Sequence, residues 1–161
     1  MTGGVERHDT VDINRFYYES MDDVILKDLK TEMALNIWWK ATKKDGGQYH
    51  TDWVPMTEAD LAILQLIITA AGISPAGNGK GGNDLWEARE GLLTFPDGRQ
   101  VYVGFHLYSH EDAIGGGLGG VWTGPEFGHF CMYHGDSTGD SWGVDNFNNA
   151  AKNAANSTTL H

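Results

Sequence analysis

The sequence contains a single cysteine, Cys131, among its 161 residues. An intrachain disulfide is therefore excluded, and a chain without disulfides is typical of a reducing compartment, so we expect a cytoplasmic location. Residues 1–10 are polar and lack the apolar segment of a secretory signal. Because the chain has the length of one domain, we expect a flexible tail over 1–10 and a single domain over 11–161.

Long apolar runs are also absent. The longest, Leu61 to Ile73, is interrupted by Gln65, Thr69 and Gly72. It is too short to cross a bilayer, which takes about 20 residues. We therefore expect a buried helix here and no membrane partner.

Basic residues are missing from two windows. No Lys or Arg occurs between Arg99 and Lys152, or over residues 45–79, and the chain carries a net charge of −11. Such a surface repels phosphate backbones, so direct nucleic-acid binding is not expected. It would attract a basic protein or a cation. The alternative is that the acids only keep the protein soluble.

Alternating polarity predicts strands in three regions. Leu35–Ala41 and Gln48–Val54 flank an Asp-Gly turn, which predicts a hairpin. A second hairpin, with strands Leu92–Phe95 and Gln100–Ser109, is expected around Pro96-Asp97-Gly98. One more strand, Phe127–His134, is expected further along the chain.

Three helices are predicted. Thr57 and Asp60 form a capping box for a helix over 57–71 that stops at Gly72 and is apolar nearly all round. Ser20 and Asp23 suggest a second capping box, for a helix in which Met21, Ile25 and Leu29 fall on one face at helical spacing. A short Ala- and Asn-rich helix is expected near Val144 to Ala155. The predicted fold is α+β: a largely antiparallel sheet of about five strands packed on a central apolar helix, with short N- and C-terminal helices and one sheet face partly open.

Potential metal ligands and bases concentrate in the last two predicted strands and their ends. They are His106, His110, Glu111, His129, Cys131, His134 and Asp136. If the strands are neighbours, His106 faces His129, and Asp136 or Glu111 completes a site for zinc or another divalent metal. No closely spaced ligand motif is present, so scattered polar residues are the alternative.

Cys131 is a candidate nucleophile, because His129 shares its strand face and His106 would lie opposite. The alternative is simple burial. Cysteine is among the most buried residue types, and Cys131 lies between Phe130 and Met132 in a segment without fixed positive charge.

Six tryptophans are many for this length. Trp38 falls on the polar side of its strand, beside Asn36 and Lys40, while Trp122 and Trp142 lie among acids and glycines. Exposed aromatic side chains within an acidic rim are typical anchors of protein-binding surfaces. Partial burial under neighbouring loops is the alternative.

These features favour a non-enzymatic, acidic protein-binding module without a cofactor, which engages a basic partner that itself binds nucleic acid. An inhibitor or immunity protein and a viral antagonist both fit. The expected binding residues are Glu111, Asp112, Trp122, Glu126, Asp136, Asp140 and Trp142. The alternative is a small hydrolase, with or without a metal, using His106, His129 and Cys131. The sequence indicates neither the partner's identity nor the oligomeric state.

Overall fold

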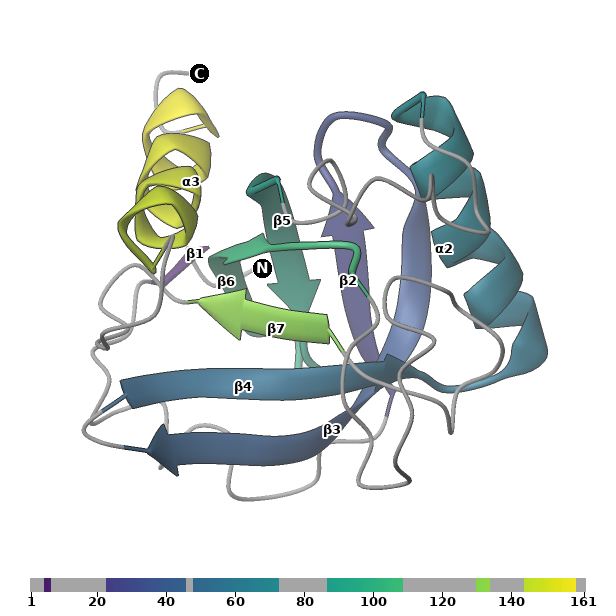
Figure 1. The fold of residues 1–161 in the computed structure, drawn as a ribbon, viewed down its shortest axis with the longest axis horizontal. Coiled ribbons are helices and arrows are strands. Elements are labelled where there is room, and N and C mark those ends of the chain that lie inside the picture. The colour runs from purple at the N-terminus through teal and green to yellow at the C-terminus, as the bar shows by residue number, and fades with distance from the viewer. Residues whose placement is uncertain are drawn as a thin grey trace.

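The computed structural model describes residues 5–6, 23–45, 48–72, 87–108, 130–133 and 144–158. Within these ranges the chain forms strands and two helices, shown in Figure 1. The strands are β1 (Val5–Glu6), β2 (Val24–Asp28), β3 (Ala34–Asp45), β4 (Gln48–Pro55), β5 (Arg89–Thr94), β6 (Gln100–Phe105) and β7 (Phe130–Tyr133). The helices are α2 (Glu58–Ala70) and α3 (Val144–Thr158).

Six of the strands close into an antiparallel barrel. They follow the order β6-β5-β2-β3-β4-β7, and β7 pairs again with β6. β1 runs parallel to β6 at Gln100 and Val101, whereas β7 pairs with β6 at Gly104 and Phe105. The residues of β1 belong to segment 1–10, most of which lies outside the described residues.

The α+β class and the antiparallel pairing confirm the prediction in its broad form. The expectation of a sheet of about five strands, packed on a central helix with one face partly open, is wrong in these details, because six strands curve round until β7 pairs with β6. Closure removes the open sheet edges and lets side chains from all six strands share one interior.

The expected helix beginning near Ser20 is also wrong over residues 24–28, which form β2. Val24, Leu26 and Asp28 are buried while Ile25 is exposed, which is a period of two. The helical spacing of Met21, Ile25 and Leu29 was a coincidence. Pairing with β3 and β5 on both sides makes this segment a central barrel strand.

Both predicted hairpins are confirmed. β3 pairs with β4 from Ile37 opposite Pro55 to Asp45 opposite Gln48, with an irregularity between Trp39 and Ala41. β5 pairs with β6, and Gly98 takes a positive φ of 91° in the turn between them. Glycine adopts that conformation without the steric cost of a Cβ atom.

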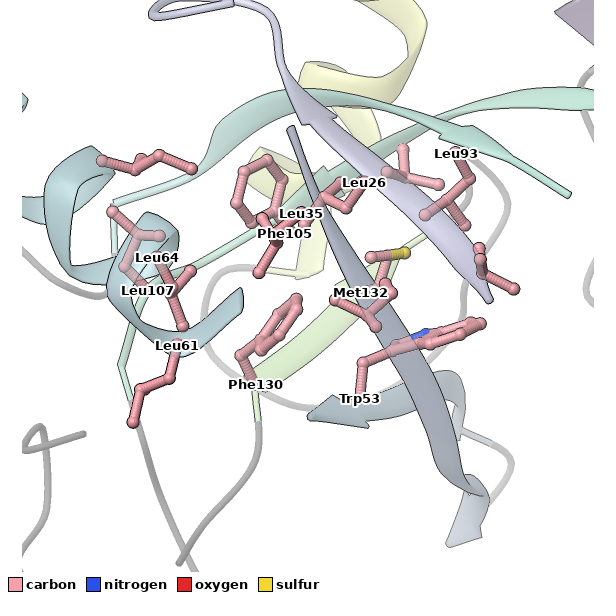
Figure 2. Packing of buried hydrophobic residues seen from close by; sticks show 14 of the residues in the cluster. Leu26, Leu35, Trp53, Leu61, Leu64, Leu93, Phe105, Leu107, Phe130 and Met132 are labelled. Atoms are coloured by element: carbon pink, nitrogen blue, oxygen red, sulfur yellow. The ribbon is translucent and has the colours of Figure 1, made fainter. Parts of the chain in front are cut away.

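The core lies inside the barrel and includes the buried face of α2. Figure 2 shows Leu61 and Leu64 of α2 directed toward the same cluster as Phe105 and Phe130 from the strands. The rings of Phe105 and Phe130 are tilted, with centroids 6.2 Å apart. α2 is not buried all round, since Leu66 is 57% exposed. The helix therefore supplies one side of the core and is not its centre.

The capping box at the start of α2 is confirmed. The Asp60 amide donates to Thr57 Oγ1 at 3.2 Å, and the Thr57 hydroxyl donates to Asp60 Oδ2 at 2.7 Å. Asp60 Oδ1 also accepts from the Asn36 amide of β3 at 2.9 Å. Thr57 thus caps the helix, and the buried Asp60 carboxylate ties its first turn to the barrel wall.

Helix α3, confirmed near its predicted position, covers the outer face of β5 and β6 (Figure 1). Tyr102 packs with Ala154, and Tyr133 stacks on Phe147 with ring centroids 4.7 Å apart. The approach is closest at Gly104, where a Cβ atom would lie 2.0 Å from the Phe147 carbonyl oxygen. Neither described helix has the length and apolar character needed to span a membrane.

Candidate functional site

Most of the residues that the sequence singles out lie outside the described ranges. These are Glu111, Asp112, Trp122, Glu126, Asp136, Asp140 and Trp142 from the binding set, and His110, His129 and His134 from the histidine cluster. Of the candidate catalytic and metal-binding residues, His106 and Cys131 are described. The structure therefore shows how His106 and Cys131 lie, while the roles of all these residues stay predictions.

His106 and Cys131 do lie together, and Asp52 joins them. Cys131 of β7 is the register partner of Asp52 of β4, and its backbone amide donates to His106 Nε2 at 3.0 Å. The three side chains form a row across β4, β7 and the end of β6, on the outer face of the barrel. We call them the Asp–His–Cys cluster. Their exposed fractions are 1% for Asp52, 0% for His106 and 4% for Cys131.

The His106 ring is placed by backbone amides. Its Nε2 lies against the Cys131 amide, and its Nδ1 lies 3.1 Å from the Tyr108 amide. The ring also meets Phe147 of α3 edge-on, with centroids 5.7 Å apart. An imidazole ring has at most one acceptor nitrogen when neutral, so one of the two amides donates to the ring at a time. His106 thus helps to join β6 to β7 where the barrel closes.

The Cys131 thiol points to a carboxylate. Its Sγ lies 3.4 Å from Asp52 Oδ1, within the distance of a hydrogen bond donated by sulfur. A thiolate here would face the negative charge of Asp52, whereas reactive cysteines lie in electropositive, accessible surroundings. The Cys131 sulfur is therefore buried and next to a carboxylate in this arrangement.

The same geometry bears on metal binding. Among the residues that the structure describes, no group of three or more His, Cys, Asp or Glu side chains is arranged to hold a metal ion. His106 Nε2 is directed at an amide rather than at the Cys131 sulfur. Asp52 was missed by sequence reasoning, because only the register of β4 with β7 brings it beside Cys131.

A second region is exposed. On the outer wall of β2 and β3, Ile25 is 40% and Trp38 is 38% exposed. Ile25 is the register partner of Asn36, so Trp38 is its diagonal neighbour on the same face. We call Ile25, Lys27, Asn36 and Trp38 the Trp38 face. The placement of Trp38 on the polar side of its strand is confirmed, and its 38% exposure lies between the exposed anchor and the partly buried side chain that the sequence left open.

Exposed carboxylates lie at both ends of the Trp38 face. At one end Asp23 immediately precedes β2, and its amide contacts Met56 Sδ at 3.3 Å. Glu32 lies in the turn at the other end, with a positive φ of 63°. Lys27 and, in the turn, Lys30 are the nearby bases in the described chain. The face therefore combines an indole and an aliphatic side chain with acidic and basic side chains in equal number.

A buried ion pair near the same turn is structural. Arg89 Nε and Nη2 donate to the two carboxylate oxygens of Asp28 at 2.9 and 3.0 Å, and the Thr31 amide and hydroxyl donate to Oδ2. Burial by itself raises the pKa of Asp28. Hydrogen bonds from Arg89 and Thr31 and the charge of Arg89 outweigh it, so the pKa lies below its usual value. Both carboxylate oxygens of Asp28 are hydrogen-bonded within the fold, so the pair holds β2 to β5.

Comparison with known proteins finds no matching family model, no matching curated protein and no matching solved structure. The protein is therefore classed by its architecture, as an α+β protein with a closed six-stranded antiparallel barrel. A barrel of this kind does not specify a function, which has to be argued from its side chains.

Proposed function

We propose that the protein is a non-enzymatic binding module that engages a basic protein partner. The observation that carries the proposal is the exposed indole of Trp38, beside Ile25, on the barrel wall of a chain with net charge −11. Large aromatic side chains supply much of the binding energy at protein interfaces. A surface of one predominant sign steers an oppositely charged partner and raises its association rate.

The described chemistry supports binding over catalysis. The thiol of Cys131 contacts a carboxylate, and His106 lies against two backbone amides. Both side chains are buried, so a substrate would have no access to them in this arrangement. An inhibitor or immunity role, or antagonism of a nucleic-acid-binding protein, would each use the negative net charge of the chain to attract a basic partner. These roles belong to the same proposal.

The proposal is tested by affinity capture with the full chain at low and at high salt. We expect recovery of a basic protein whose retention falls as salt rises, since electrostatic attraction is screened. Charge reversal at Glu126 and Asp136, two residues of the predicted acidic set, should weaken retention of that protein.

Salt-independent capture, or retention unchanged by both reversals, would contradict the electrostatic part of the proposal. Turnover of a substrate that is abolished by His106→Ala in a folded variant would favour the hydrolase alternative. Thermal unfolding of each variant is the control, because a buried histidine also contributes to stability.

A further inference from the structure

Among the described residues, the seam between β6 and β7 has the shortest strand pairing of the six-stranded barrel. It consists of two register pairs, Gly104 opposite Tyr133 and Phe105 opposite Met132. Each of the other neighbouring strands in the barrel shares three or more pairs with its partner. Because a segment held by few backbone hydrogen bonds opens at a lower free energy, we expect the barrel to open first at this seam.

A side chain continues the seam by one position. In the same register the next pair is His106 opposite Cys131, and there the Cys131 amide donates to His106 Nε2 at 3.0 Å. A backbone carbonyl oxygen accepts a hydrogen bond at any pH, whereas an imidazole nitrogen accepts one only while it carries no proton. This hydrogen bond across the seam therefore depends on the protonation of one side chain.

The closed seam opposes protonation of His106. The residue is 0% exposed, so a charged ring would be held away from water. Its Nδ1 and Nε2 face the amides of Tyr108 and Cys131. A neutral ring accepts from one of these amides, but an imidazolium accepts from neither and directs an N–H group at each. Protonation thus costs the seam a buried hydrogen bond and places a charge beside two donors.

The charged groups around the ring act from further away. Asp52 lies on β4, two strands from β6, with Cys131 between them. Glu90 of β5 is the register partner of Gly104, which makes it a diagonal neighbour of His106 at ~7–8 Å. Both carboxylates attract an imidazolium, but neither contacts the ring nitrogens through a hydrogen bond that would replace the amide contacts. The other described ionisable side chains on this face are Cys131, Tyr133 and, exposed on α3, Lys152.

We propose that His106 is a pH-sensitive switch of the barrel, and that its protonation separates β7 from β6 while the rest of the barrel stays folded. The inference is independent of the proposed binding function. Separation lets water solvate the charged ring and removes its contacts with the two amides, so the open form takes up the proton more readily than the closed form. Closure is therefore complete above about pH 6.5, where a solvated imidazole is neutral, and weakens as the pH falls below that value.

Cys131, the one cysteine of the sequence, reports the opening of the seam. Its side chain packs with Phe147 of α3, and α3 covers β5 and β6, so separation of β7 from β6 uncovers the thiol. The probe is dithiodipyridine, a disulfide that reacts with thiols in mild acid. Labelling rates of the full chain are measured between about pH 7.5 and about pH 5. Each rate is divided by that of the urea-unfolded chain at the same pH, which removes the pH dependence of the thiol itself.

We expect this labelling ratio to rise about thirtyfold over the range, since one proton bound near pH 6.5 multiplies the open population by up to tenfold per pH unit. His106→Gln should keep the ratio flat, because its side-chain oxygen accepts a hydrogen bond at any pH. Asp52→Asn, the matched control, removes the nearby carboxylate and should keep the rise. Hydrogen exchange of the Leu26 amide in β2, measured by NMR, should show that the remaining barrel stays closed.

A flat ratio in the wild type, or an equal rise in His106→Gln, would overturn the proposal. Loss of the rise in Asp52→Asn would also overturn it, because the carboxylate would then be the titrating group. Exchange at Leu26 that accelerates in step with labelling would show unfolding of the whole chain instead of a switch at the seam. If His106→Gln does not fold, the imidazole ¹⁵N signals of the wild type decide. Protonation of His106 in step with labelling supports the switch, and protonation while Cys131 stays unreactive overturns it.

Discussion

Asp52 and Cys131 face each other across the β4–β7 ladder, with the thiol sulfur 3.4 Å from a carboxylate oxygen. The contact lies beside the closure of the barrel, where β7 pairs with β6 through Gly104–Tyr133 and Phe105–Met132. Polar side chains thus reinforce the point where a four-residue strand completes the barrel. Asp52 and Cys131 thus have a structural role at the closure of the barrel, which differs from the role of an exposed catalytic pair.

Cys131 should react slowly with a thiol reagent in the native protein. Its exposed fraction is 4% and its neighbour is a carboxylate, so both access and ionisation are opposed. The measurement is the rate of labelling by Ellman's reagent in buffer and in urea. Rapid, stoichiometric labelling of the folded protein would restore Cys131 as a candidate nucleophile.

Asp28→Ala should destabilise the protein by about 3–5 kcal/mol, because it leaves the Arg89 guanidinium buried without its partner. The matched control is Asp97→Ala, which breaks an exposed Asp97–Arg99 pair and should cost much less, because solvent screens an exposed pair. Urea unfolding of both variants gives the two free energies. Equal losses would show that burial of the Asp28 pair has no special energetic consequence.

The Asp28 carboxylate should make stability depend on pH in the acid range. Its folded pKa is lowered, so the unfolded chain binds a proton more readily. The stabilisation is therefore complete above the unfolded value, near 4, and is lost as pH falls through the lower folded value. Unfolding free energies between neutral and acid pH should fall less steeply for Asp28→Asn. Parallel curves for variant and wild type would contradict this assignment.

Two glycine substitutions should differ sharply. At Gly104 a Cβ atom would lie 2.0 Å from the backbone oxygen of Phe147, so α3 has to move. At Gly91 the nearest atom is 2.9 Å away on the Phe105 ring, which can rotate. We expect Gly104→Ala to lower the free energy of unfolding by about 3 kcal/mol or more, and Gly91→Ala to lower it less. Thermal or urea unfolding measures both. The opposite order would mean that α3 is held loosely.

Much of the local structure could be predicted from single segments. Thr57 and Asp60 predicted the start of α2, and Gly72, with φ of 81°, its end. The hairpins followed from alternation and turn residues, because a strand pair joined by a short turn is a local structure. The segment around Ile25 was misread because a short apolar run fits helical and strand spacing equally well, and pairing with β3 and β5 decides between them.

The candidate sites also divide into features that one segment predicts and features that only the pairing of distant strands decides. Exposure of Trp38 could be predicted, because strand alternation within one segment places it opposite the buried Leu35 and Ile37. The contact of Asp52 with Cys131 could not, since 79 positions separate them. No spacing rule connects residues so far apart, and the register of β4 with β7 is set by the barrel as a whole.

The sequence by itself determined the α+β class, the capped helix, the hairpins and the acidic charge of the chain, because each depends on composition or on neighbours along the chain. Only the tertiary structure decided that the sheet closes, that α3 covers one part of the wall and leaves Trp38 exposed on another, and that the cysteine meets a carboxylate. Those outcomes depend on which distant strands pair, and pairing minimises the free energy of the whole barrel rather than of any one segment.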